Sequence, residues 1–247
     1  MISFLLVTGP PFDAPLWTPV LERIRSQEHH ATAATMLNGG DGSLESEAAN
    51  LAEQIRKANG KVVLVAHGTA IPAAIKACQE AAPAGLVLSN GPLTETDLFT
   101  RALIRWAHLP KTITETLFSP ERSINFLASS VGLRRLVVNP YVMDHDTTVM
   151  VCGPIFQSND RLGRMRNYLR TLESDPYPNI PEGIPTLLCW GDADPISNWN
   201  NITFNNEDSP LIERNPVPGG RYLHPVERPW ELADRCIHWV ENSLTTT

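Results

Sequence analysis

Short apolar runs alternate with amphipathic segments through the first part of the chain, and this alternation limits the fold more than any other feature. Four apolar runs have the length and composition of strands buried on both faces of a sheet: residues 3–7, 31–37, 62–65 and 86–88. Three segments between them carry apolar residues at helical spacing: residues 16–26, 44–58 and 71–80. Strands joined by helices pair in parallel through right-handed crossovers. The sequence therefore predicts an α/β protein with a doubly wound, mostly parallel sheet.

The alternation breaks off in the middle of the chain. Four segments there have helical periodicity instead: residues 98–109, 113–117, 119–131 and 160–172. Later the alternation resumes, with strands expected at 184–190 and 211–217 and a closing helix at 229–243. We therefore expect a core formed by residues 1–93 and 174–247, with a helical cap of residues 94–173 over a cleft.

Charge and composition exclude several classes of partner. The net charge of −7 argues against nucleic acid, because phosphate binding requires clustered lysines and arginines. Two segments are rich in arginine, residues 134–135 and 161–170, and we interpret them as solvated helix faces. No apolar run approaches the roughly 20 residues that span a bilayer, and the first residues lack a basic leader. The four cysteines are scattered and lack zinc-site spacing. We expect a cytoplasmic protein with no membrane partner, metal or cofactor.

Four turn motifs carry the functional information, and they matter as an ordered set. They are Thr8-Gly9-Pro10-Pro11, the strand and turn at residues 61–70, Trp190-Gly191-Asp192-Ala193-Asp194-Pro195, and the turn at residues 218–229. Their order and spacing resemble the α/β-hydrolase superfamily over nearly the whole chain, where such turns hold the oxyanion donors, nucleophile, acid and histidine. The resemblance implies the branch of the α/β-hydrolase fold that lacks the leading β-hairpin and carries a helical cap insertion.

The nucleophile elbow has no nucleophile. The resemblance aligns Gly68 with the serine, aspartate or cysteine of the superfamily, and glycine has no side chain that can attack a substrate. Thr69 follows one residue late, so its hydroxyl is expected to point away from the site. We instead expect Gly68 to leave room for a substrate at the N-terminus of the following helix.

The oxyanion hole is incomplete as well. One donor would be the backbone N–H of Thr69, and the other would come from Pro10, which has no N–H. One such donor stabilises a transition state by roughly 3–4 kcal/mol. The missing nucleophile and the missing oxyanion donor are independent of each other. Together they argue that the alignment with the superfamily is in the correct register and that the hydrolase residues are truly absent.

The triad histidine is replaced, and only the acid remains. The histidine position aligns with Tyr222, whose phenol offers one hydrogen bond to a ligand, while His224 lies two residues further and points elsewhere in the simple register. Asp194 either stabilises its own turn or serves as a hydrogen-bond acceptor or base. Asn90, at the end of the strand where some members keep an alternative acid, offers only a neutral amide.

The candidate site is assembled from these turns. The candidate catalytic residues are Asp194, Tyr222 and His224, and the predicted substrate-binding residues are Thr8, Pro10, Pro11, Gly68, Thr69, Asn90 and Tyr222. His67 is interpreted as a buried residue that packs under the elbow, and Asp144-His145-Asp146 as a solvated loop. The cap is expected to pack most of its large apolar side chains in its own core and to line an apolar cleft with the rest: Phe99, Trp106, Phe118, Phe126, Tyr141, Met143, Met150 and Phe156.

Three functions are compatible with this pattern. The first is a non-hydrolytic enzyme of natural-product biosynthesis, which would run a proton transfer such as an epimerisation by positioning and with a base that the substrate supplies. In fold and reaction class it is similar to the peptidyl-aspartate epimerases of bottromycin biosynthesis. The second is a non-catalytic ligand-binding or receptor-like protein. The third is a hydrolase that uses Thr69, His224 and Asp194. In each case the expected partner is a peptide or an apolar small molecule in the cleft.

Overall fold

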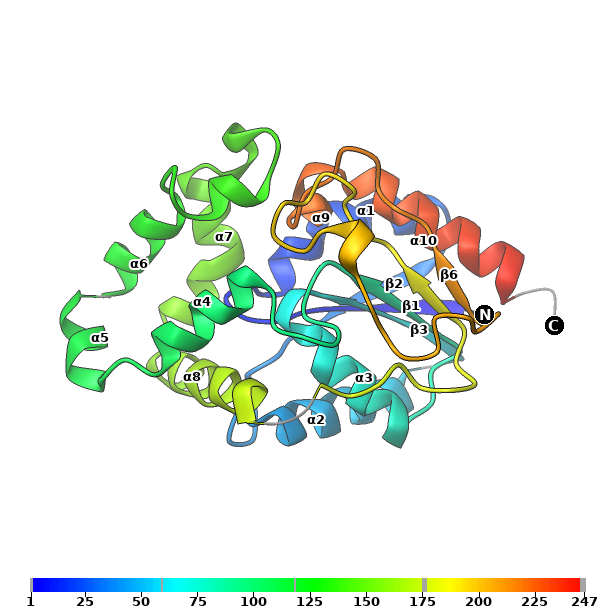
Figure 1. The fold of residues 1–247 in the computed structure, drawn as a ribbon, viewed down its shortest axis with the longest axis horizontal. Helices are drawn as coiled ribbons and strands as arrows, with labels where there is room; N and C mark the ends of the chain where they lie inside the picture. The colour runs from blue at the N-terminus through cyan, green and yellow to red at the C-terminus, as the bar shows by residue number, and fades with distance from the viewer. Residues whose placement is uncertain (1, 59, 118, 175–176, 245–247) are drawn as a thin grey trace.

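A single parallel sheet forms the centre of the molecule (Figure 1). The computed structural model describes residues 2–58, 60–117, 119–174 and 177–244. Its strands are β1 (Ile2–Thr8), β2 (His30–Ala34), β3 (Lys61–His67), β4 (Gly85–Ser89), β5 (Thr186–Leu188) and β6 (Ile212–Arg214). They lie in the order β2-β1-β3-β4-β5-β6, and every neighbouring pair is parallel. The predicted doubly wound α/β fold is confirmed.

Helices cover both faces of the sheet. Figure 1 shows α1 (Thr18–Ser26) and α10 (Pro229–Ser243) on one face, and α2 (Leu44–Lys57) and α3 (Ile71–Glu80) on the other. The central strands β1, β3 and β4 are therefore almost entirely buried, which explains their continuous apolar runs. Within the described part of the chain, no helix is both long and apolar enough to cross a membrane.

A second group of helices lies beside the carboxyl ends of the strands, at the left of Figure 1. It consists of α4 (Leu98–Ala107), α5 (Lys111–Leu117), α6 (Pro120–Leu127), α7 (His145–Phe156) and α8 (Asn159–Ser174), with the short 3-10 helices η3 (Leu133–Leu136) and η4 (Pro140–Met143). These helices occupy the segment that was predicted as a cap. The exact boundaries of that cap stay a prediction.

One element of the cap contradicts the sequence interpretation. Asp144, His145 and Asp146 are exposed to solvent, as expected, but they do not form a loop: Asp144 is the N-cap of α7, and the other two residues begin the helix. The Asp144 side chain accepts a hydrogen bond from the backbone N–H of Thr147 at 2.8 Å. The helix was missed because threonine, valine, Gly153 and Pro154 give it low intrinsic propensity, so tertiary packing must stabilise it.

Smaller differences occur at the ends of other elements. The predicted strand 31–37 ends at Ala34, and Leu37 has a positive φ of 64° in the loop that follows. The predicted strands 184–190 and 211–217 shrink to three residues each. Proline splits the predicted helix 16–26 into the 3-10 helix η1 (Ala14–Trp17) and α1. Phe118, one of the expected cap aromatics, lies outside the described residues.

Candidate functional site

The elbow between β3 and α3 has the backbone of a nucleophile turn. Residues Gly68–Ala70 form the 3-10 turn η2, and Gly68 adopts the left-handed region with φ of 65°. Its N–H donates to the backbone oxygen of Asn90 at 2.8 Å. Side chains with a Cβ disfavour this conformation, so glycine satisfies the turn without strain. The local geometry is therefore kept although the nucleophile is absent.

The side chain of Tyr222 occupies the space above Gly68. A Cβ placed on Gly68 would lie 3.3 Å from the Tyr222 hydroxyl oxygen. Tyr222 is fully buried, and its hydroxyl has no hydrogen-bond partner among the described residues. Burial raises the pKa of this phenol well above its ordinary value. The expected open space over Gly68 is thus wrong, although a binding role of Gly68 stays a prediction.

Thr69 and Pro10 lock the neighbouring turn. The Thr69 hydroxyl donates to the carbonyl oxygen of Pro10 at 2.7 Å, so it points toward the first turn and away from the elbow's reactive position. Gly9 makes this approach possible, because a Cβ there would lie 2.3 Å from the Thr69 hydroxyl. From the cap, the Tyr168 hydroxyl donates to the Thr69 carbonyl oxygen at 2.6 Å. The turn is therefore held from both sides.

Asp194 and Asn90 bond to each other and to the surrounding backbone. The Asn90 amide nitrogen donates to Asp194 Oδ2 at 2.6 Å, and its amide oxygen accepts from the N–H of Gly191 at 2.8 Å. Asp194 also accepts from the backbone N–H groups of Ile196 and Ser197, at 3.0 and 3.3 Å. Burial raises the pKa of the Asp194 carboxyl to about 6, although these hydrogen bonds oppose the shift. The geometry is that of a residue that stabilises its own turn.

His224 begins the short helix α9 (His224–Glu227), and its ring faces the interior. Its Nε2 lies 3.1 Å from the Ser89 hydroxyl, and its Nδ1 lies 3.1 Å from the Arg221 carbonyl oxygen. Burial lowers the pKa of His224 to about 4. His67 shares the hydroxyl of Ser89 at 3.1 Å and is fully buried under the elbow, in agreement with its structural interpretation. Burial, followed by the proximity of His224, lowers the His67 pKa as well.

The alternative triad is not assembled. Among the described residues, the side chains of Thr69, His224 and Asp194 hydrogen-bond to separate partners and not to one another. A serine-type mechanism requires the nucleophile, base and acid in one hydrogen-bonded chain. The structure therefore lacks the arrangement that this hydrolase hypothesis requires.

All the predicted binding residues are closed to solvent. Each of them is buried: Thr8, Pro10, Pro11, Gly68, Thr69, Asn90 and Tyr222. An aromatic layer lies against Tyr222: the ring of Phe99 packs on Tyr222 with centroids 5.2 Å apart and on Phe12 with centroids 5.9 Å apart. The structure thus brings the predicted residues together, but beneath the cap helix α4 and not at an open surface.

A large cavity lies on the other side of this layer. Its volume is about 830 Å³, and Phe99, Trp106, Phe126 and Phe156 line it together with aliphatic side chains of the cap. None of the predicted catalytic or binding residues lines it, but Pro195 and Ile196, which follow Asp194, do. A volume of this size is typical of sites for small organic ligands or short peptides. The expected apolar cleft is present, and the cap forms most of its wall.

The charged residues of the cavity were missed by sequence reasoning. Arg134, Arg135 and Arg221 line it, and no acidic, histidine, lysine, cysteine or tyrosine side chain of the described residues does. The first two had been interpreted as a solvated helix face, which is wrong for Arg134, since it is half-buried and its Nε donates to the carbonyl oxygen of Met143 at 3.1 Å. The available signal was a pair of arginines inside an otherwise apolar segment.

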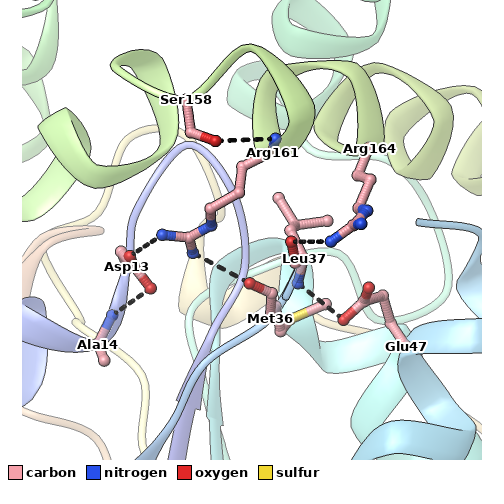
Figure 2. A network of polar contacts seen from close by, with 8 residues as sticks. All are labelled: Asp13, Ala14, Met36, Leu37, Glu47, Ser158, Arg161 and Arg164. Atoms are coloured by element: carbon pink, nitrogen blue, oxygen red, sulfur yellow. Dashed lines mark hydrogen bonds and ion pairs between the residues drawn. The ribbon is translucent and has the colours of Figure 1, made fainter. Parts of the chain in front are cut away.

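Arginines of α8 hold the cap on the core, as Figure 2 shows. Arg161 bonds to Asp13 Oδ2 at 2.6 Å and to the carbonyl oxygen of Met36 at 3.0 Å, and Arg164 donates to the carbonyl oxygen of Leu37 at 3.1 Å. The Arg161 and Asp13 side chains are only 14% and 6% exposed. The interpretation of residues 161–170 as a solvated face is therefore wrong for Arg161, because it joins two layers of the fold.

The chemistry of the site includes no evident metal centre. Within the described ranges, no group of three or more histidine, cysteine, aspartate or glutamate side chains is arranged to hold a metal ion. The described cysteines are free and buried. Burial raises the pKa of Cys78 to about 12, so that thiol stays protonated and unreactive at neutral pH.

Comparison with known proteins gives the fold but no family. No protein-family model matches the sequence, and no curated protein matches it. Among solved structures, an esterase from Thermogutta terrifontis is similar, with 18% identity and a TM-score of 0.72 over 99% of this chain and 91% of that one. The epoxide hydrolase CorEH has 13% identity and a TM-score of 0.72 over 98% and 92% of the two chains.

A third similar structure is described by its fold. It is an alpha/beta hydrolase fold protein from Burkholderia ambifaria, with 15% identity and a TM-score of 0.69 over 96% of this chain and 90% of that one. At such identities the likeness concerns the fold alone. This chain has the α/β-hydrolase fold.

Proposed function

We propose that this protein is a non-hydrolytic enzyme that transfers a proton at a stereocentre of a bound peptide or small molecule, as an epimerase does. The observation that carries the proposal is the exchange at the elbow: Gly68 stands where a nucleophile would be, and the hydroxyl of Tyr222 fills the space above it. Acyl transfer requires a nucleophile, and proton transfer does not.

The chemistry of the cavity supports a base that the ligand itself carries. Apart from arginines, no titratable side chain of the described residues lines the 830 Å³ cavity. Arginine stays protonated and cannot act as a base at neutral pH. A group on the substrate would take the Cα proton, and a water molecule that enters from the open side of the cavity would return a proton on the opposite face. This reaction consumes no oxidant and no second substrate.

The protein's contribution would be to position the ligand. When the protein holds the substrate's own base against the Cα–H bond, proton transfer no longer requires an encounter between two molecules. In well-oriented systems the effective concentration of such a base is roughly 10⁵ M and above. Apolar side chains such as Phe99, Trp106 and Leu133 would orient the apolar part of such a ligand. A cavity without a protein base is consistent with this division of labour.

Deuterium incorporation tests the proposal. Capped hydrophobic tripeptides that differ only in a central Asp, Asn, Ala or Phe would be incubated with the protein in D₂O and analysed by mass spectrometry and chiral amino-acid analysis. We expect one peptide class to gain one deuterium at the central Cα and to form the epimer. Ala102→Trp, which places a large side chain in the cavity from the middle of α4, should abolish the exchange. Exchange that survives this variant would place the reaction outside the cavity.

A second candidate is a non-catalytic ligand-binding protein. The specific observation in its favour is that Asp194, Tyr222 and His224 are all sealed from the cavity. Tight binding of a peptide without Cα exchange would favour this function and refute the enzyme. A burst of product from an ester substrate, abolished in Thr69→Ala, would refute both and restore the hydrolase.

A further inference from the structure

The cavity contains an unusual combination of charge and apolar surface. Its lining is mostly aliphatic and aromatic, yet the charged side chains among its described residues are all arginines: Arg134, Arg135 and Arg221. The protein as a whole carries a net charge of −7, so an all-positive cavity is not a consequence of composition. Positive charge in a low-dielectric cavity attracts anions more strongly than the same charge in water.

Arg221 is the most constrained of the three arginines. It is half-buried, it lies one residue before Tyr222, and its Nη1 donates to the carbonyl oxygens of Val137 at 3.1 Å and of Arg135 at 3.5 Å. These bonds fix the guanidinium plane against η3. By contrast, Arg135 is exposed, and the Nε of Arg134 donates a hydrogen bond to the carbonyl oxygen of Met143.

One edge of the Arg221 guanidinium has no protein partner. Its Nε is buried without a hydrogen-bond partner, and among the described residues Arg221 forms no ion pair with a carboxylate. The unpartnered edge of a guanidinium formed by Nε and Nη2 presents two parallel N–H donors, which match the two oxygens of a carboxylate. Because protein atoms close off the Nε, a ligand carboxylate in the cavity would meet Nη2 first and would pair with both nitrogens after a small shift of the side chain, which would also satisfy the buried Nε.

We propose that Arg221 anchors a carboxylate on an otherwise apolar ligand in the cap cavity. This inference rests on the proposed function in that it names the ligand class of the same cavity. Pairing with a guanidinium lowers the pKa of a carboxylate and makes it a weaker base. The anchored carboxylate is therefore a different group from the one that takes the Cα proton.

A matched pair of fluorescent probes tests the anchor without any knowledge of the natural substrate. The probes are 11-(dansylamino)undecanoate and its primary amide, which differ only in the charge of the head group. We expect the wild-type protein to bind the carboxylate roughly 10- to 100-fold more tightly than the amide, the range for hydrogen bonds to charged groups. Arg221→Met should remove this preference and leave the affinity for the amide unchanged.

Two further variants make the test specific. Arg105→Met removes an exposed arginine of α4 that does not line the cavity, and it should keep the full preference. Arg221→Lys keeps the positive charge but loses the paired donors, so it should keep only part of the preference. It also serves where the methionine variant fails to fold.

The outcomes separate this inference from the proposed function. A carboxylate preference that persists in Arg221→Met, equal binding of both probes to the wild type, or binding of neither probe would overturn the anchor. As competitors, dodecanoate should displace the bound probe better than dodecyl phosphate, and the reverse order would overturn the assignment to a carboxylate. Deuterium exchange plays no part in these measurements, so its failure would refute the proton transfer and leave the anchor standing.

Discussion

Restoring a serine at the elbow should cost stability and yield no hydrolase. In Gly68→Ser the backbone must keep a φ of 65° with a Cβ present, which costs about 1–2 kcal/mol. The new Cβ would lie 3.3 Å from the Tyr222 hydroxyl, which is tighter than most real contacts, and the serine oxygen needs further room. For a chain of this size the backbone cost alone corresponds to a fall in Tm of about 2–8 °C.

A second glycine separates the two contributions. Gly183 also has a positive φ, 85°, but nothing lies within 4 Å of the Cβ that a side chain there would add. Gly183→Ser therefore measures the backbone cost alone, and the excess loss in Gly68→Ser measures the contact with Tyr222. Calorimetric unfolding of both variants gives this difference. The double variant Gly68→Ser with Tyr222→Phe should recover most of the excess, because the hydroxyl is gone.

The single variant Gly68→Ser should remain inactive toward esters. A serine at position 68 would face the phenol of Tyr222 in place of a histidine base, and Pro10 still lacks the N–H of the second oxyanion donor. The missing donor alone is worth about 3–4 kcal/mol of transition-state stabilisation. Release of p-nitrophenol from p-nitrophenyl acetate is the assay. A stoichiometric burst in Gly68→Ser, or a stability loss no larger than that of Gly183→Ser, would refute the reasoning about this turn.

Three further predictions concern buried polar groups. Tyr222→Phe removes a buried hydroxyl without a partner, so the free energy of unfolding should stay the same or rise by up to about 1 kcal/mol. Urea titrations measure this change, and a loss above about 2 kcal/mol would contradict the prediction. The raised pKa of Asp194 means that the folded protein favours the protonated carboxyl. The wild type should therefore lose about 2 kcal/mol of stability relative to Asp194→Asn as the pH rises from about 4 to 6, and parallel stability curves would exclude this carboxyl as the cause. Arg161→Met leaves the buried Asp13 carboxylate unpaired and should cost about 3–5 kcal/mol. By contrast, Arg23→Met breaks an exposed pair and should leave the free energy of unfolding nearly unchanged. Equal losses in the two variants would show that burial does not decide the outcome.

The core could be predicted because its signals are local. The apolar runs of β1, β3 and β4 and the periodicity of α2, α3 and α10 are properties of short segments, and each matches an observed element closely. Helix α7 could not be predicted in this way, since its residues have low helix propensity and its stability depends on the packing of the cap around it. The short strand β6 was overestimated for a related reason, because its length depends on pairing with β5.

The sequence by itself determined what the elbow lacks. A glycine at position 68, a proline at position 10 and a tyrosine at position 222 exclude a side-chain nucleophile, an N–H donor and an imidazole at those positions, whatever the fold. Only the tertiary structure decided what replaces them. Tyr222 fills the space over Gly68, and Phe99 separates both from an arginine-lined cavity, because three segments far apart in the sequence meet at the carboxyl end of the sheet. No local pattern encodes which side chains meet there, since that is set by how the cap packs on the core.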